Sequence, residues 1–146
     1  MPIEKIDLKL INFFRMISVP TARLGLFVIF FWFGALKVVG LSPANFLVQE
    51  LFEQTVQMMT FGQFIILFGL FECIIGILFI VPKMERVVIP LLLVHMITTF
   101  MPLFILPEIT WNGLFVPSLE GQYIIKNLVI IASAIGIVAH LHPLGK

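Results

Sequence analysis

The sequence predicts an all-α polytopic membrane protein, built as a bundle of four transmembrane helices. Apolar residues make up 60% of the 146 residues, charged residues only 12%, and the mean hydropathy is +1.13. Soluble domains contain about 25% charged residues, so this composition indicates a lipid environment. Four apolar segments have the length of about 20 residues that a helix needs to cross a hydrocarbon core. Their short connections predict one membrane domain over residues 1–146.

The N-terminal residues 3–17 predict an interfacial amphipathic helix. Apolar side chains share one helical face and polar side chains occupy the opposite face; the apolar set is Ile3, Ile6, Leu10, Phe13, Phe14 and Ile17, and the polar set is Lys5, Lys9, Asn12 and Arg15. A helix with this pattern lies in the plane of the membrane surface, with its apolar face in the acyl boundary. We expect the chain to turn inward after it.

The four spans follow at approximately 22–41, 62–82, 86–106 and 121–140. Between the first two, Ser42 and Pro43 signal a helix start, and residues 47–55 predict a second surface helix. Between the last two, residues 107–120 contain two prolines and a glycine, which indicates an ordered loop, with Trp111 at the level of the lipid headgroups.

The distribution of basic residues predicts the orientation of the bundle. They lie before the first span, between the second and third spans, and at the chain end: Lys5, Lys9, Arg15, Arg23, Lys83, Arg86 and Lys146. The other two connections contain glutamates and no lysine or arginine. Because basic residues are retained inside, we expect a multi-pass protein of the cell (inner) membrane with both termini in the cytoplasm. The net charge of +1 gives no reason to expect a nucleic-acid partner.

Polar groups inside the spans are the candidate ligand-binding residues. Counted at the rise of an α-helix, Lys37 and Lys126 lie about 6 and 9 Å below the outer end of their spans. Glu72 and His95 lie near the middle of theirs, and Asn127 follows Lys126. Ionisable groups at such depth face the bundle interior and mark functional sites, although a structural ion pair and snorkelling lysines remain the open alternatives. We expect these five side chains to share one polar pocket in the outer half of the bundle.

Glycines indicate which face of the second span meets another helix. Gly62, Gly69 and Gly76 recur every seven residues and form a smooth stripe for close helix packing. Glu72 lies three residues after Gly69 and four before Gly76, so it shares this stripe and faces protein.

Several kinds of chemistry have no motif in this sequence. Cys73 is the single cysteine, which excludes an internal disulfide and dithiol chemistry. The spans contain no histidine pair at helical spacing for zinc or haem, so we expect no metal site. No catalytic residue can be assigned from a nucleophile or phosphate-loop motif.

Three stretches carry a family resemblance: "RLGLFVIFFWFGALKVVGLSPANFLV", "FGLFECIIGILFIV" and "GQYIIKNLVIIASA". With Gly34 and Lys37 ending the first span and Glu72 between glycines in the second, the chain resembles the DoxX-like membrane proteins over residues 22 to about 140. The resemblance implies a redox-associated membrane subunit that binds a quinone or similar amphipath, with a membrane or redox protein as partner. A scaffold or assembly factor, a small-solute pathway and a homo-oligomer remain open.

Overall fold

The computed structural model describes residues 2–56 and 58–142, and it confirms an all-α membrane protein. Four helical segments are long and apolar enough to cross a membrane: Ile3–Val38, Phe61–Ile80, Glu85–Ile105 and Leu119–Val138. The helices are α1 Pro2–Val38, α2 Asn45–Thr55, α3 Phe61–Ile80, α4 Glu85–Phe100, α5 Pro102–Ile105, α6 Pro107–Thr110, α7 Leu119–Lys126 and α8 Leu128–Val138. The two strands are β1 Trp111–Gly113 and β2 Val116–Pro117.

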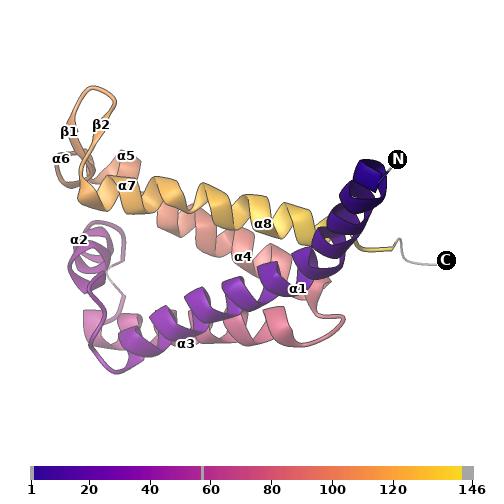
Figure 1. Ribbon diagram of the computed structural model, residues 1–146. Coiled ribbons are helices and arrows are strands. Elements are labelled where there is room, and N and C mark those ends of the chain that lie inside the picture. The colour runs from indigo at the N-terminus through magenta and orange to yellow at the C-terminus, as the bar shows by residue number, and fades with distance from the viewer. Residues whose placement is uncertain (1, 57, 143–146) are drawn as a thin grey trace.

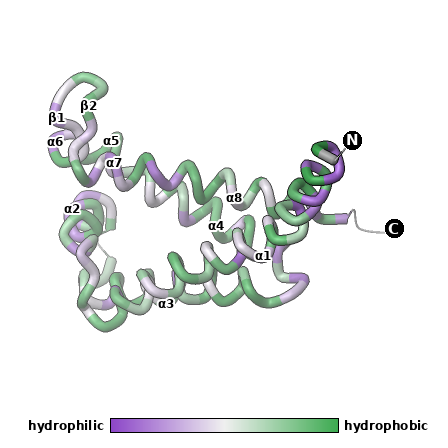
Figure 2. Tube along the Cα trace, in the orientation of Figure 1, coloured by the Kyte–Doolittle hydropathy of each residue, from purple (hydrophilic) through white to green (hydrophobic). Residues whose placement is uncertain are grey.

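The helices form two layers (Figure 1). Helices α1 and α3 run antiparallel in one layer, and α4 and the pair α7–α8 form the other. The N-terminus, the C-terminal segment and the α3–α4 turn lie at one end, while α2 and the hairpin lie at the opposite end. Hydrophobic residues line the lengths of the helices and many hydrophilic residues gather toward the two ends (Figure 2). The core between the layers includes Leu26, Phe30, Ile75, Phe79, Val88, Leu92 and Ile137.

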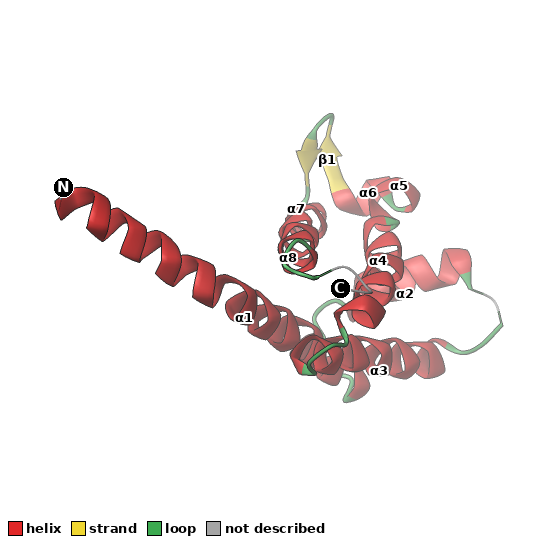
Figure 3. Ribbon diagram, turned by 90° about the vertical axis from the view of Figure 1, so that its right-hand side faces the viewer, coloured by secondary structure: helices red, strands yellow, loops and turns green. Residues whose placement is uncertain are grey.

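The predicted break between the N-terminal amphipathic segment and the first span is wrong, because residues 2–38 form one continuous helix. Pro20 lies inside α1 without ending it. A proline removes only its own N–H and disturbs one preceding carbonyl, so the helix can continue past it. The N-terminal half of α1 leaves the bundle sideways, as the view in Figure 3 shows. Its apolar and polar faces are therefore both exposed in the isolated chain.

Glycines bring α1 and α3 into backbone contact. A Cβ atom on Gly34 would lie 2.6 Å from the Gly69 carbonyl oxygen, and one on Gly76 would lie 2.7 Å from the Phe31 nitrogen. No side chain fits at such distances, so both helices need glycine there. Gly62 departs from the expected stripe, because a Cβ on it would meet nothing within 4 Å. The stripe is thus shorter than the sequence predicted, since α1 has ended before it reaches the first turn of α3.

Arg23 links α1 to the C-terminal end of α3. Its Nε donates to the Phe79 carbonyl at 2.6 Å, one Nη donates to the Val81 carbonyl at 2.9 Å, and the other forms an ion pair with Glu85. A guanidinium at a helix C-terminus satisfies carbonyls that have no partner within the helix. This contact fixes the register of α1 against the α3–α4 turn.

The expected loop over residues 107–120 is more regular than the sequence predicted. After α6, the strands β1 and β2 pair antiparallel, with Trp111 opposite Pro117 and Gly113 opposite Val116. Asn112 and Gly113 lie in β1, and the two residues between the strands are Leu114 and Phe115. The indole Nε1 of Trp111 donates to the Leu103 carbonyl at 3.0 Å. The second surface helix, expected over 47–55, is α2.

Candidate functional site

Three ionisable side chains from three helices meet inside the bundle. Lys37 of α1 donates from Nζ to Glu72 Oε2 of α3 at 2.6 Å, and His95 Nε2 of α4 lies 2.9 Å from Glu72 Oε1. Each residue is only 5–6% exposed. We call Lys37, Glu72 and His95 the buried triad. Glu72 is its centre, because each of its carboxylate oxygens contacts a different partner.

The glycine contact between α1 and α3 positions the first of these pairs. Lys37 lies three residues after Gly34, and Glu72 lies three residues after Gly69. A Cβ on Gly69 would be 3.0 Å from the Cβ of Lys37, so the lysine stem crosses α3 where that helix has no side chain. The ammonium then reaches the carboxylate one turn further along α3. Close packing and charge pairing are therefore parts of one arrangement.

Each charge in the triad is stable inside the bundle only because it has a charged or hydrogen-bonding partner. A buried ion is costly unless it is paired and hydrogen-bonded, and the lipid around the bundle adds no partner. The ammonium of Lys37 balances the carboxylate of Glu72, which also accepts from the imidazole N–H of His95. The Lys37 ammonium also lies 5.6 Å from the centroid of the Phe68 ring, within cation–π range.

Thr99 completes the hydrogen bonding of His95. The Thr99 hydroxyl lies 3.2 Å from His95 Nδ1 and donates to the His95 carbonyl at 3.0 Å. A hydroxyl can donate or accept, so it can donate to Nδ1 of a neutral ring or accept from the N–H of a protonated one. Rotation of one O–H bond thus decides whether Thr99 donates to Nδ1 or to the His95 carbonyl.

Phenylalanines enclose the imidazole. The Phe68 ring stacks on His95 at 5.2 Å between centroids and 11° between planes, Phe30 approaches edge-on at 5.1 Å, and Phe71 lies at 6.2 Å. From Phe68, stacked and tilted rings continue through Phe64 to Phe52 of α2. A row of aromatic rings therefore connects the triad with the end of the bundle that holds α2.

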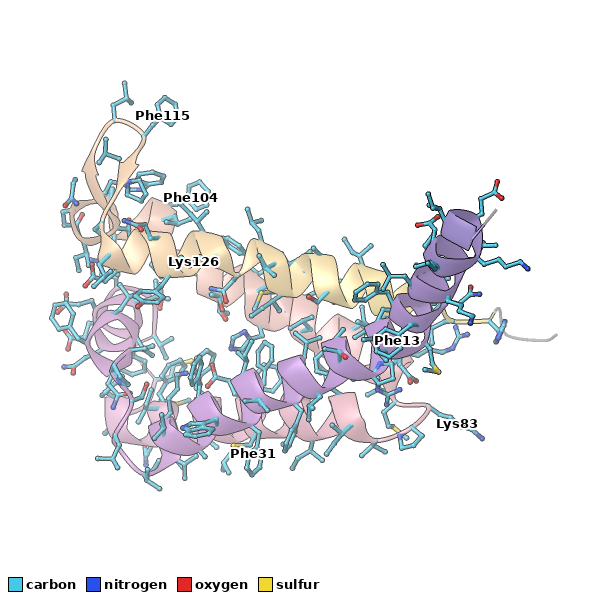
Figure 4. All side chains as sticks on the ribbon, viewed as in Figure 1. Phe13, Phe31, Lys83, Phe104, Phe115 and Lys126 are labelled. Atoms are coloured by element: carbon cyan, nitrogen blue, oxygen red, sulfur yellow. The ribbon has the colours of Figure 1, made fainter. Side chains whose placement is uncertain are left out.

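The side chains of Lys126 and Asn127 do not join the triad in the shared pocket that the sequence predicted. The side chain of Lys126 is exposed, and its ammonium lies 4.9 Å from the Tyr123 ring centroid (Figure 4 labels Lys126 on α7). Asn127 separates α7 from α8 and donates its amide to the Tyr123 and Ile124 carbonyls at 3.2 and 3.1 Å. Depth along a helix does not fix the direction of a side chain around it, so a similar depth was insufficient evidence.

Among residues 2–56 and 58–142, no three His, Cys, Asp or Glu side chains lie close enough together to hold a metal ion. The sulfur of Cys73 lies 3.5 Å from the Phe31 carbonyl oxygen. Two shallow surface pockets, one beside Gln63 and one beside Arg23, are lined by residues other than the triad.

Sequence reasoning missed the aromatic enclosure of His95, because it considered only the ionisable and polar groups inside the spans. A signal was present: Phe64, Phe68 and Phe71 recur at helical spacing beside Glu72. It also missed the contact of Arg23 with Glu85, which could have been inferred from opposite charges at neighbouring span ends.

Comparisons with protein-family models, with curated proteins and with solved structures found no match to this chain. What the site can do therefore follows from its own geometry.

Proposed function

We propose that this protein is a DoxX-like subunit of a membrane redox system, and that it binds a quinone-like amphipath beside the buried triad. The observation that carries the proposal is Glu72 held between Lys37 and His95, all three buried in a membrane-spanning bundle. Intramembrane ionisable groups are rare, and their usual roles are ligand recognition and proton transfer.

The triad has the groups that quinone chemistry needs. A quinone carbonyl accepts a hydrogen bond, which Lys37 or His95 can donate, and its reduction to a quinol takes up two protons together with two electrons. His95 and Glu72 can exchange protons, with Thr99 adjusting to either state of the imidazole. The electrons would come from a redox protein partner.

The aromatic row supplies a place for the ring. Phe68 lies parallel to the imidazole, and rotation of its side chain would leave a flat apolar slot of the kind that a quinone ring fills. The row of rings from Phe52 through Phe64 leads from one end of the bundle to this slot. We propose it as the path of the ligand.

A scaffold or assembly factor is the second candidate, and one observation favours it. Every ionised group of the triad already has a partner within the chain, as in a structural ion pair that fixes helix register. On this alternative the triad binds nothing. A small-solute pathway is a third candidate, which flux measurements in liposomes would test.

Photolabelling separates the first two candidates. An azido-quinone analogue would be cross-linked to the protein in nanodiscs, with decylubiquinone as competitor and peptide mapping as the readout. We expect labelling of α3 and α4 near Glu72 and His95 that decylubiquinone suppresses. The Lys37→Met/Glu72→Gln double variant should lose this labelling while it remains folded, and Lys126→Met should keep it. Labelling that decylubiquinone does not suppress would refute quinone binding and favour the scaffold.

We also propose that both termini lie in the cytoplasm of a cell with this protein in its inner membrane. The basic residues at the end of the bundle where α1 begins and α8 ends support this orientation. In a Cys73→Ser background, a cysteine at exposed Glu108 should react with an impermeant maleimide from outside intact cells, and one at exposed Lys9 should not. The reverse labelling pattern would overturn the orientation.

A further inference from the structure

The hairpin formed by β1 and β2 presents an apolar tip. Leu114 is 88% exposed and Phe115 is 85% exposed, and Val116 beside them is 54% exposed. The stretch 109–119 contains no charged residue. Hairpin tips in water usually carry glycine, asparagine or aspartate, so two large apolar side chains at this place need an explanation.

The backbone at the tip adds a second argument. Phe115 has a φ of +58°, in the left-handed region that glycine and asparagine adopt most readily. A bulky residue is strained in this region, so its presence there indicates an interaction of its side chain that compensates for the strain. In this conformation the ring points away from the bundle, as Figure 4 shows at the label Phe115.

The base of the hairpin is held firmly against the bundle. Thr110 is fully buried and donates to the Leu106 carbonyl at 2.9 Å, while its own carbonyl accepts from the Ser118 N–H at 2.9 Å. Ser118 caps the start of α7 by accepting from the Gly121 N–H at 3.1 Å. The close approach of Thr110 to Gly121 leaves no room for a side chain at residue 121. The direction of the hairpin is therefore fixed.

That direction is sideways, across the axes of the helices (Figures 1 and 3). The hairpin connects two membrane-spanning segments, Glu85–Ile105 and Leu119–Val138, so it leaves the bundle at a membrane boundary. Exposed apolar side chains also lie on the helices on either side of the hairpin, namely Phe104 at 81%, Leu119 at 63% and Tyr123 at 62%. These three residues belong to the two membrane-spanning segments that the hairpin connects.

We infer that the hairpin is a lateral membrane anchor, whose tip residues Leu114 and Phe115 insert among the lipids of the leaflet at that end. The bilayer is the occupant because the apolar tip lies between two membrane-spanning segments that themselves carry exposed apolar side chains next to the hairpin, on α5 and α7. The indole of Trp111, bound to the Leu103 carbonyl, then lies at the interface, where tryptophan is enriched. Such an anchor would restrain rotation and tilt of the α7–α8 segment.

Depth-dependent fluorescence quenching tests this inference without reference to any redox role. In a Cys73→Ser background, an NBD fluorophore would be attached to a cysteine at Leu114 or, as the matched control, at exposed Glu108 on α6. The protein would be studied in nanodiscs that hold one copy each, with phosphatidylcholine that carries a doxyl quencher high on its acyl chain. We expect shorter-wavelength emission and several-fold stronger quenching at 114 than at 108.

Two results would overturn the anchor. Equal, weak quenching at both positions would place the tip in water. A blue-shifted emission at 114 that appears only in densely loaded proteoliposomes, and not in single-copy nanodiscs, would show that a second copy of the chain covers the tip. Unchanged melting of each labelled variant would establish that both report on the folded protein.

Discussion

The two halves of the bundle each carry a lysine, and the structure uses them differently. In the α1–α3 half, Lys37 is 6% exposed and bonds to Glu72. In the α7–α8 half, Lys126 is exposed and lies over the Tyr123 ring. Both were expected to lie within the outer half of the membrane. The comparison teaches that depth in a span makes a charge unusual, while close packing of its neighbours decides whether the charge faces inward.

A glycine contact between two membrane-spanning helices distinguishes the α1–α3 half from the α7–α8 half. At Gly34, Gly69 and Gly76 a Cβ atom would meet backbone atoms of the other helix within 2.7 Å, whereas at Gly136 of α8 it would meet nothing within 4 Å. Backbones that touch bring the first carbons of neighbouring side chains together, so polar heads can meet inside. In the α7–α8 half, Gly121 approaches Thr110 at the base of the hairpin and a Cβ on Gly136 would meet nothing within 4 Å, so neither glycine packs against another membrane-spanning helix, and Lys126 is exposed.

The largest difference should appear when each lysine is replaced by methionine. Lys37→Met leaves the Glu72 carboxylate without its ammonium, which costs about 3–5 kcal/mol for a buried pair. Lys126→Met removes an exposed cation–π contact worth about 0.5–1 kcal/mol. Unfolding by SDS titration in mixed micelles measures both. Equal stability of the two variants would mean that Lys37 contributes no more than a surface lysine.

A smaller difference should separate two glycines. Gly69→Ala forces a methyl group against the Gly34 carbonyl oxygen and should destabilise the protein by about 1–3 kcal/mol, the usual result of overpacking. Gly136→Ala adds the same group in open space and should be neutral or stabilising by up to about 1 kcal/mol, because alanine favours helix. The same titration gives both values, and a neutral Gly69→Ala would refute the backbone contact.

The smallest effect concerns the hydroxyls beside His95. Thr99→Val removes the partner of the imidazole Nδ1 and should cost about 1 kcal/mol, the net value of one hydrogen bond. Thr98 donates only to the His95 carbonyl, which Thr99 also contacts, so Thr98→Val should cost less. Reversed effects in thermal melting would show that His95 does not depend on Thr99.

The sequence predicts the fold well because the lipid environment restricts the choices. Four long apolar segments can only be membrane helices, and the structure has the last three close to the expected bounds, while the first already begins at Ile3. The sequence predicts less well where one helix ends and the next begins. An amphipathic helix over 3–17 was expected to be separate from the first span, yet α1 continues through Pro20, since a single proline is compatible with a helix when the flanking residues favour one.

The sequence predicts the site only in part, and the reason is geometric. Spacing places Glu72 beside Gly69 on one helical face, and this placement agrees with the structure. The rotation of one helix relative to the others is set by packing across the whole interface, and no local pattern encodes it. Lys126 was misplaced for this reason, while Phe68 was overlooked because a phenylalanine in a span is so common.

The central claim is that Lys37 and Glu72 form one electrostatic unit, and a double-mutant cycle tests it most directly. The unfolding free energies of Lys37→Met, Glu72→Gln and the double variant would be measured by SDS titration against the wild type. We predict that each single change destabilises the protein and that the double variant recovers much of the loss, because no unpaired charge remains buried. A double variant whose destabilisation equals the sum of the two single effects would contradict the account.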